Sequence, residues 1–349
     1  MLVGIYEYKD PNGKYLESLK LYEKILKYNK IKFFRLYPEM LDFWKIIDSL
    51  NLFIMQFNIP LHQQIQAQDL LFIIESFHGI KCYPNLKTAW HYDDKIKQYH
   101  LLHPFGYPIT ESWIFYDKKN ALQWIEEASF PVIFKLRCGA ASQNVILLKD
   151  KKQAIMIVNR MFGRGILPDK FFYYESTRFS HFNIYRELHR ICGNIYRRSR
   201  GLDTSNHWQI NKNYVFFQKF LPNNKWDTRI TIIGKRAFAF RRMNRRNDFR
   251  ASGSGRICYD IRKIDMRCVE IAFQVSKEMD FQSMAFDFLM NEENNPEFCE
   301  ISYTYLSDAI YNCDGYWDQN LRWHEGHFWP EQLQLIDALK ISDLRIPEI

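Results

Sequence analysis

The segment that most constrains the fold is Met284 to Ser302, which places two acidic residues inside apolar, strand-like runs. Asp287 and Glu300 lie on either side of the polar loop Asn291 to Pro296. Two strand-like runs joined by a short polar loop predict a β-hairpin. An acid in each strand means that the fold must either expose these charges or give them partners.

The expected register brings the two acids together. Asp287 falls opposite Glu300, and Met290 falls opposite Glu297. Ser302 shares the face of Glu300, because side chains alternate between the faces of a strand. Carboxylates held close among apolar neighbours need a cation or a proton between them, and oxygen ligands of this kind suit Mg²⁺ together with nucleotide phosphates. The alternative is a hairpin whose acids face solvent, and this segment alone favours neither.

The composition is that of a globular protein with a sizeable core. At 349 residues and 47% hydrophobic, the chain is long enough for two or three domains. Its longest apolar runs, such as Leu70 to Ile74, are too short to span a bilayer, and the first residues begin a strand rather than a signal peptide, so we expect a cytoplasmic protein. Seven cysteines without a CxxC pair favour reduced thiols over disulfides. His324 to His327 lacks the spacing of a zinc site.

The net charge of +8 is concentrated in two stretches. Arg178 to Arg200 holds six arginines and one acid, and Arg241 to Arg250 holds five arginines and one acid. Such clusters predict anionic ligands. Nucleic acid, nucleotide phosphates and an acidic acceptor would each satisfy them, so charge does not choose among the three.

The first 85 residues alternate strand and helix patterns. This alternation predicts a parallel sheet covered by helices on both faces. No GxGxxG motif is present, so a dinucleotide site is not supported. We expect a domain boundary near residue 86.

The next part of the chain carries two lysines near a loop of small residues. Thr88 to Leu102 is expected to be a helix that contains Lys95, and Phe130 to Leu136 a strand that ends near Lys135. By itself, a lysine at a strand end is most simply a solvated residue. The segment Cys138 to Asn144 that follows is small and flexible, and such loops let backbone N–H groups approach phosphate oxygens.

The stretch from about 170 to 213 is expected to be an insertion with an arginine stripe. On a helix, apolar residues would share one face and leave arginines on the other, namely Arg186, Arg190 and Arg197. An arginine stripe is usually a solvated face, and we weigh that interpretation above a specific site for an acidic acceptor.

A second hairpin, Trp226 to Arg242, turns at Gly234-Lys235 and carries Asp227 and Arg229 on its polar face. Arginine forks match phosphate geometry in a way that point charges do not. The flanking elements are expected to be a strand at Tyr214 to Leu221, a donor-rich loop at Arg250 to Gly255, and a helix at Ile264 to Met279.

The order of these motifs resembles the ATP-grasp superfamily, specifically the carboxylate–amine ligase branch with the ribosomal-protein glutamate ligases and the D-alanine ligases. The matching positions, in chain order, are Asp94-Lys95, Lys135 with Gly139 to Asn144, Phe217 to Leu221, Asp227 with Arg229, Arg241 or Arg242, Asp287, and Glu300-Ile301-Ser302. The likeness covers roughly residues 86 to 310, and residues 1 to 85 are similar to the family's preceding domain.

The resemblance implies an α/β (α+β) protein with the ATP-grasp fold in three parts. Residues 1–85 would form the N-terminal α/β (pre-ATP-grasp) domain. Residues 86–213 would form the small subdomain with its basic insertion at about 170–213. Residues 214–349 would form the large subdomain with the metal site and an aromatic tail. The two α+β subdomains would clamp ATP between them.

The resemblance also implies roles for individual residues. ATP would be bound by Lys95, Lys135, Gly139, Ser142, Gln218, Lys219, Phe220, Leu221 and Asp227. The γ-phosphate and an acyl phosphate would be stabilised by Arg229, Arg241 and Arg250. Mg²⁺, for which Mn²⁺ can substitute, would be held by Asp287, Glu300 and Ser302. In three places the sequence departs from the family pattern: serine replaces asparagine at position 302, Lys219 replaces a common glutamate, and the loop after Lys135 has a single glycine.

The activity implied is an ATP-dependent ligation of a carboxylate and an amine through an acyl phosphate, releasing ADP. An acidic sugar or peptide is the expected acceptor, as in polysaccharide biosynthesis, and no nucleic-acid partner is expected. Two alternatives stay open: a small-molecule kinase with the same fold, and a basic nucleic-acid-binding module. The oligomeric state is open, with a homodimer as one option.

Overall fold

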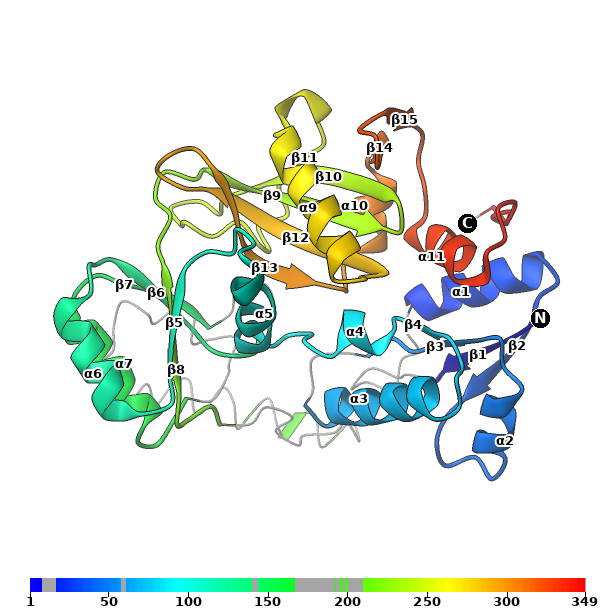
Figure 1. Ribbon diagram of the computed structural model, residues 1–349, viewed down its shortest axis with the longest axis horizontal. Helices are drawn as coiled ribbons and strands as arrows, with labels where there is room; N and C mark the ends of the chain where they lie inside the picture. The colour runs from blue at the N-terminus through cyan, green and yellow to red at the C-terminus, as the bar shows by residue number, and fades with distance from the viewer. Residues whose placement is uncertain are drawn as a thin grey trace.

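The computed structural model describes residues 1–7, 17–57, 61–139, 144–166 and 210–348, together with residues 192, 195, 196 and 199. Its strands form three sheets: a parallel sheet near the N-terminus, a small antiparallel sheet and a large antiparallel sheet (Figure 1). No helix within these described ranges is both long enough and apolar enough to cross a bilayer.

The N-terminal sheet has the order β2-β1-β3-β4, and all its described pairs are parallel. Its strands are β1 (Leu2–Tyr6), β2 (Lys32–Leu36), β3 (Leu52–Ile54) and β4 (Cys82–Tyr83). The helices are α1 (Glu17–Tyr28), α2 (Phe43–Asp48) and α3 (Leu61–Ser76). Figure 1 shows α1 on one side of this sheet and α3 on the other, which confirms the parallel, helix-covered sheet predicted from the sequence.

The small sheet has the order β5-β8-β6-β7. Its strands are β5 (Ser112–Phe115), β6 (Val132–Lys135), β7 (Val145–Leu148) and β8 (Val215–Lys219). Helices α6 (Lys118–Glu127) and α7 (Lys151–Met161) lie together on one side of it (Figure 1). Trp124 of α6 stacks on Phe217 of β8 with ring centroids 4.9 Å apart. Because side chains alternate along a strand, the neighbouring Gln218 faces the opposite side.

The large sheet has the order β13-β12-β9-β10-β14-β15, with β11 paired to β10. Its strands are β9 (Trp226–Ile233), β10 (Arg236–Met243), β11 (Ile257–Cys258), β12 (Ser283–Met290), β13 (Pro296–Ser302), β14 (Gly315–Asp318) and β15 (Trp323–Glu325). Helix α9 (Met266–Glu278) packs on β9 and β12. The C-terminal helices are α10 (Ser307–Tyr311) and α11 (Pro330–Leu339), and α11 lies beside α1 (Figure 1).

The helix predicted at Thr88 to Leu102 is wrong in one respect, because the structure has two helices there. They are α4 (Leu86–Ala89) and α5 (Lys95–Leu102), and the short helix η1 (His103–Phe105) follows. Asp93, between them, has a φ of 52°, which no α-helix accommodates. The next residue, Asp94, begins the second helix, since its carboxylate accepts a hydrogen bond from the Lys97 N–H.

Strand β8 joins the small sheet rather than opening the large one. It lies between β5 and β6, so the chain passes to the large sheet after Lys219. The expected division at 213/214 would have placed this strand in the large subdomain. The strand pairing moves the crossing to the segment between β8 and β9, and this segment also borders the cavity described next.

Candidate functional site

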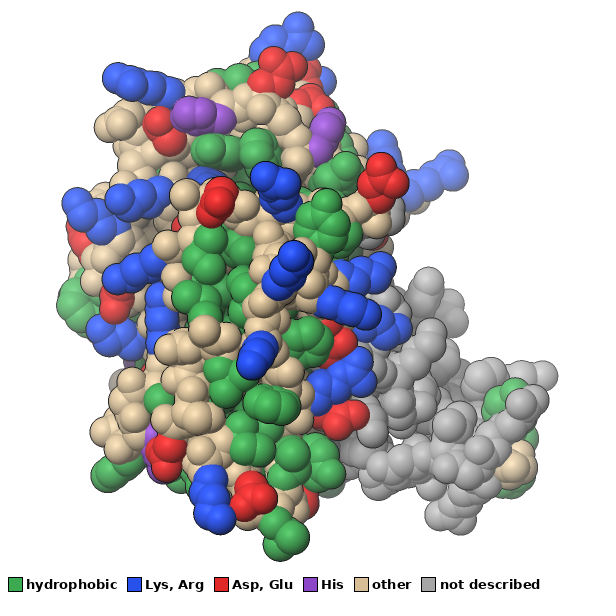
Figure 2. Space-filling view, turned by 90° about the vertical axis from the view of Figure 1, so that its right-hand side faces the viewer, with side chains coloured by type: hydrophobic (Ala, Val, Ile, Leu, Met, Phe, Trp, Pro, Cys, Tyr) green, Lys and Arg blue, Asp and Glu red, His purple; other side chains and the backbone are tan. Residues whose placement is uncertain are grey.

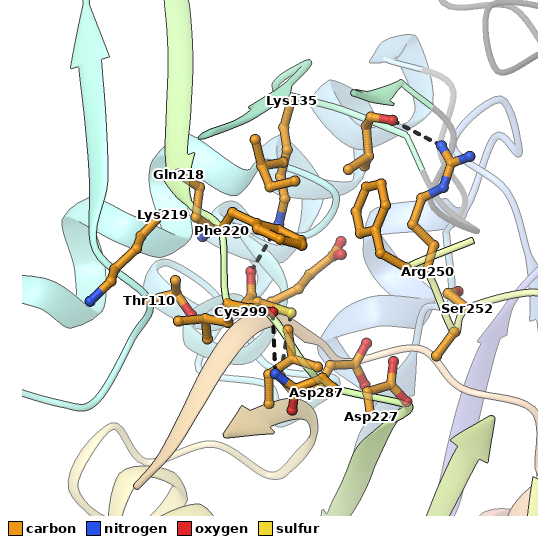
Figure 3. A pocket seen from close by; sticks show the side chains of 18 of the residues that line it. Thr110, Lys135, Gln218, Lys219, Phe220, Asp227, Arg250, Ser252, Asp287 and Cys299 are labelled. Carbon is orange, nitrogen blue, oxygen red and sulfur yellow. Dashed lines mark hydrogen bonds between the residues drawn. The ribbon is translucent and has the colours of Figure 1, made fainter. Parts of the chain in front are cut away.

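A cavity lies between the small sheet and the large sheet, next to the segment that joins them (Figure 3). Residues of β6 and β8 line one side of it, and residues of β9, β10, β12 and β13 line the other. It encloses about 910 Å³ with its open mouth included. In Figure 3, Lys135 reaches in from the small sheet while Asp227 and Asp287 lie on the opposite wall.

The acid-bearing hairpin forms part of the large-sheet wall. Strands β12 and β13 pair antiparallel, and Asp287 lies directly opposite Glu300, which confirms this part of the predicted register. Both side chains line the cavity. Asp287 is buried, whereas the Glu300 side chain is 31% exposed.

The predicted pairing of Met290 with Glu297 is wrong because β13 contains a bulge. The register shifts after the acid pair, so that Met290 pairs with Pro296 and not with Glu297. The extra residue is Cys299, which has no partner on β12. The consecutive residues Cys299 and Glu300 both line the cavity, whereas a regular strand would turn one of them away.

Two arginines neutralise the acids of the large sheet. Arg229 donates to both oxygens of Asp287 at 2.7 and 2.8 Å. Arg242 donates to both oxygens of Asp227 at 2.7 and 2.6 Å, and its Nη2 lies 2.8 Å from Asp287 Oδ2. Burial alone would raise the pKa of Asp287, but the charges of Arg229 and Arg242 hold it well below its usual range. Asp287 is therefore an ionised carboxylate at neutral pH.

Two lysines bring positive charge to the cavity from separate elements. Lys95, at the start of α5, donates from Nζ to the carbonyl oxygen of Gly139 at 2.9 Å and lies 3.3 Å from Glu300 Oε1. Lys135, at the end of β6, is buried and donates to the carbonyl oxygen of Cys299 at 3.5 Å. Burial lowers the pKa of Lys95, but nearby carboxylates, Glu300 first, raise it above its usual value. Lys95 is therefore charged although it is buried.

The turn after β6 is held by the residues that precede α5. The Gly139 N–H donates to Asp93 Oδ1 at 2.8 Å, and Arg137 Nε donates to Asp94 Oδ2 at 2.7 Å. The Lys95 backbone N–H donates to the Arg137 carbonyl oxygen at 2.9 Å. Gly139 has a φ of 122°, which favours glycine. These contacts bring together Lys95 and Gly139, two of the residues expected to bind phosphate.

All four residues expected to form the adenine-holding hinge line the cavity, namely Gln218, Lys219, Phe220 and Leu221. Phe220 meets Phe249 edge to face, with ring centroids 5.7 Å apart. Figure 3 shows Phe220 across the middle of the cavity and the ammonium end of Lys219 directed away from Asp287. The Phe220 ring therefore lies in the cavity, and the Lys219 ammonium lies away from Asp287.

Arg241 is not part of the cavity, which corrects the expected set of arginines. Its guanidinium lies 4.4 Å from the centroid of the Trp226 ring, and Trp226 is not among the lining residues. Arg242 lines the cavity instead, because neighbouring residues of a strand point to opposite faces. Counting from the turn between β9 and β10 places Arg242 directly opposite Asp227, so the sequence itself could have made this choice.

The other two expected arginines are bound by protein groups. Arg250 lines the cavity, but it bonds to Asp248 at 2.7 Å and donates to the Val145 carbonyl oxygen at 2.9 Å (Figure 3). This second bond links a loop of the large sheet to β7 of the small sheet. Arg229 reaches Asp287 without lining the cavity itself.

Of the carboxylates that line the cavity, Asp287 and Glu300 suit Mg²⁺, and Ser302 does not join them. Arg229 donates one hydrogen bond to each oxygen of Asp287, and Arg242 also contacts Oδ2. A carboxylate has about four acceptor positions, so these three contacts do not fill it. Glu300 stays partly open to the cavity. Mg²⁺ commonly takes one or two carboxylates together with phosphate oxygens. The Ser302 hydroxyl instead donates to the Thr304 carbonyl oxygen at 2.9 Å.

Other expected or missed residues complete the description. Ser142 lies outside the described residues. Sequence reasoning missed several lining residues, including Thr110, Asn223 and Phe249. They lie in loops whose position depends on tertiary packing, and no local pattern marks them. Within the described ranges, no group of three or more His, Cys, Asp or Glu side chains is placed to hold a metal ion, so protein carboxylates alone do not form a complete metal shell.

Comparison with solved structures identifies proteins of similar overall structure. Biotin carboxylase from Campylobacter jejuni, solved as a β,γ-ATP complex, matches with a TM-score of 0.57 and 11% identity over 96% of this chain and 70% of that chain. The ATP-grasp ligase PsnB, complexed with minimal precursor, matches with a TM-score of 0.54 and 14% identity over 97% of each chain. N5-carboxyaminoimidazole synthetase from Staphylococcus aureus matches with a TM-score of 0.53 and 12% identity over 99% of this chain and 78% of that chain.

No protein-family model and no curated protein sequence matches the chain. The identity to the three solved structures is too low to carry their activities or substrates to this protein. Their overall structures, however, match nearly the whole chain. The parallel N-terminal sheet, followed by two antiparallel sheets with a cavity between them, is therefore the ATP-grasp fold.

Proposed function

We propose that this protein is an ATP- and Mg²⁺-dependent ligase that joins a carboxylate to an amine through an acyl phosphate and releases ADP and phosphate. The observation that carries this proposal is the cavity between the two antiparallel sheets. It brings the cross-strand acids Asp287 and Glu300 within one site that also holds Lys95 and Lys135. Charges of both signs in one cavity suit a nucleoside triphosphate and its metal ion.

The protein's part in such a reaction is alignment and charge neutralisation. The hinge would hold the base, with the Phe220 ring against it. Lys95 and Lys135 would neutralise the phosphates, and Gly139 would let the backbone come close to them. The substrate carboxylate attacks the γ-phosphorus and ADP leaves. The amine then attacks the acyl carbon and phosphate leaves. Holding the reactants in line is the main source of rate, and no protein nucleophile is needed.

Asp287 and Glu300 are the residues that would hold Mg²⁺, and Mn²⁺ could take its place. The metal ion would supply positive charge beside the phosphates and so stabilise the transferred group. Arg229 and Arg242 keep Asp287 ionised and fixed in direction, so that it needs no rearrangement to act as a ligand.

The acceptor is proposed to be acidic, such as an acidic sugar precursor or an acidic peptide. Support comes from the arginine-rich stretch Arg178 to Arg200, with six arginines and one acid. Most of this stretch lies outside the described residues, so the proposal rests on its charge alone.

A nucleic-acid-binding module fits the described residues less well. In the second arginine-rich stretch, Arg242 and Arg250 bond to carboxylates and Arg241 stacks on Trp226. These side chains serve the fold rather than an open basic surface. Figure 2 shows one face of the molecule, on which Lys and Arg side chains are spread among acidic and apolar ones.

The test is an assay of ADP and AMP with purified protein, Mg²⁺ and ATP, to which pools of carboxylates and amines are added separately and together. We expect ADP only when both a carboxylate and an amine are present, and none with Asp287→Asn. AMP would contradict the acyl-phosphate route. ADP formed without an amine would favour the kinase alternative, and salt-sensitive nucleic-acid binding without ATP binding would favour the basic module.

A further inference from the structure

Gln218 lies at the end of β8, where its side chain faces the cavity. It is 3% exposed and lines the cavity wall next to the hinge. Its Nε2 donates to Ser112 Oγ at 3.1 Å. Ser112 is its direct partner on the neighbouring strand β5. The Ser112 hydroxyl in turn donates to the carbonyl oxygen of Thr110 at 2.9 Å.

This short chain of hydrogen bonds has only one consistent direction. A backbone carbonyl oxygen accepts and never donates, so the proton of the Ser112 hydroxyl goes to Thr110. The Ser112 oxygen is then left as an acceptor, and it requires a donor from Gln218. The Gln218 amide must therefore turn its NH₂ group toward Ser112.

The opposite end of the amide, Gln218 Oε1, is consequently fixed as a hydrogen-bond acceptor. No residue among those described donates a hydrogen bond to it. This oxygen opens on the cavity rather than being fully buried, so a ligand that excludes water from it must supply a donor in its place. A purine with an amino group at position 6 offers such a donor. A purine with an oxygen at position 6 would place two acceptors against each other.

We propose that Ser112 is a positioning residue that selects 6-amino purine nucleotides over 6-oxo purine nucleotides by fixing the direction of the Gln218 amide. The inference rests on the proposed function, because it requires that the cavity takes a purine nucleotide. Ser112 itself acts only through Gln218. The selectivity arises because a site built to pair one hydrogen-bonding pattern leaves buried polar groups unpaired with the other.

The test compares the dissociation constants of three nucleotides measured by calorimetry with Mg²⁺ present. The probes are ATP, its 6-deamino analogue purine riboside triphosphate, and inosine triphosphate, which carries the 6-oxo group. The wild type is expected to bind ATP about tenfold more tightly than the 6-deamino analogue, the equivalent of one neutral hydrogen bond. Inosine triphosphate is expected to bind more weakly still.

The Ser112→Ala variant releases the amide, which can then flip to suit either base. We expect the variant to bind ATP more weakly, and inosine triphosphate more tightly, than the wild type does. The ratio of the two dissociation constants should therefore shrink about tenfold. If Ser112 had only a structural role, the variant would bind both nucleotides more weakly by a similar factor. Ser112→Thr keeps the hydroxyl and is expected to restore the wild-type ratio. Ser283→Ala, a buried serine of β12 that bonds to Tyr305, is the matched control.

Equal binding of ATP and its 6-deamino analogue by the wild type would overturn the inference without any variant. An unchanged ratio, or a parallel loss, in a folded Ser112→Ala protein would also overturn it. If the wild type binds none of the three nucleotides, the proposed function fails, and this inference fails with it.

Discussion

Asp287 is the carboxylate that pairs with two largely buried arginines at the site. It accepts hydrogen bonds from Arg229 and lies against Arg242, and all three side chains are largely buried. A buried charge that loses its partner is strongly destabilising, although replacing a whole ion pair often is not. Substitutions here should therefore affect stability and activity together, and the two effects have to be measured separately.

The Asp287→Asn variant is expected to lose about 3 kcal/mol of unfolding free energy at neutral pH, because two buried arginines lose a charged partner. The pKa of Asp287 is held below its unfolded value of about 3.9. Its stabilising contribution is therefore complete above about pH 4 and is lost as the pH falls toward the folded pKa. Urea unfolding at a series of pH values should show that the unfolding free energy of the variant falls less steeply with acid than that of the wild type. Parallel curves of unfolding free energy against pH would contradict this account.

Arg242 and Arg241 provide a matched pair of neighbours on opposite faces of β10. Arg242→Lys keeps a positive charge but loses the fork that grips Asp227 at two points. We expect ADP formation to fall at least about tenfold for Arg242→Lys, since loss of one charged hydrogen bond costs roughly 1.5–3 kcal/mol. Arg241→Lys should change it little. Equal losses for both variants would mean that the two faces are assigned wrongly.

At the scale of elements, the segment before α5 both caps this helix and supports the turn that borders the cavity. Asp94 caps α5 and also accepts from Arg137, next to the Gly139 turn. Asp150 caps α7 in the same way, on an exposed helix end away from the cavity. The two caps have similar geometry, so their substitution separates the effect of a lost cap from the effect on the site.

Both Asp94→Ala and Asp150→Ala are expected to lower the unfolding free energy by about 1 kcal/mol, the usual value of an N-cap. Only Asp94→Ala should also weaken ATP binding, because Lys95 and the turn after β6 lose their support. Thermal unfolding and ATP titration of the two variants check this. If Asp150→Ala weakened ATP binding as strongly, the link between α5 and the site would be contradicted.

The sequence predicted most elements and the pairing of Asp287 with Glu300, because turns and alternation are local properties. It missed the bulge at Cys299, since an extra residue leaves no mark in a short polar and apolar pattern. It also missed the separation of α4 from α5, which depends on the backbone of Asp93. The place of β8 depends on pairing with β5 and β6, strands distant in the chain, and no local pattern reports it.

At the scale of the whole molecule, α11 ties the C-terminal part to the N-terminal sheet. Tyr22 of α1 donates to Gln334 of α11. Glu331, at the start of α11, is 2% exposed, and its Oε1 accepts a hydrogen bond from Ser307. Its other oxygen has no hydrogen-bond partner among the described residues. A buried acid with one open oxygen favours the neutral form.

Burial raises the pKa of Glu331 to about 7, above its unfolded value of about 4.3. The folded protein therefore binds more protons between these values, and the contribution to stability is lost as the pH rises from about 4.3 through 7. We expect the wild type to lose about 3 kcal/mol over this range through this group. In denaturant unfolding, the unfolding free energy of Glu331→Gln should depend less on pH over this range than that of the wild type. An equal slope of unfolding free energy against pH would contradict the prediction.

The central claim is that the cavity between the two antiparallel sheets binds Mg²⁺ and ATP. Calorimetric titration of ATP into the wild type and into Lys135→Met, with and without Mg²⁺, tests it most directly and needs no knowledge of the other substrates. We expect one site per chain, tighter binding with Mg²⁺, and at least about tenfold weaker binding by Lys135→Met, because a buried charge that faces the phosphates is lost. An absence of binding, or equal affinity of the variant, would contradict the account.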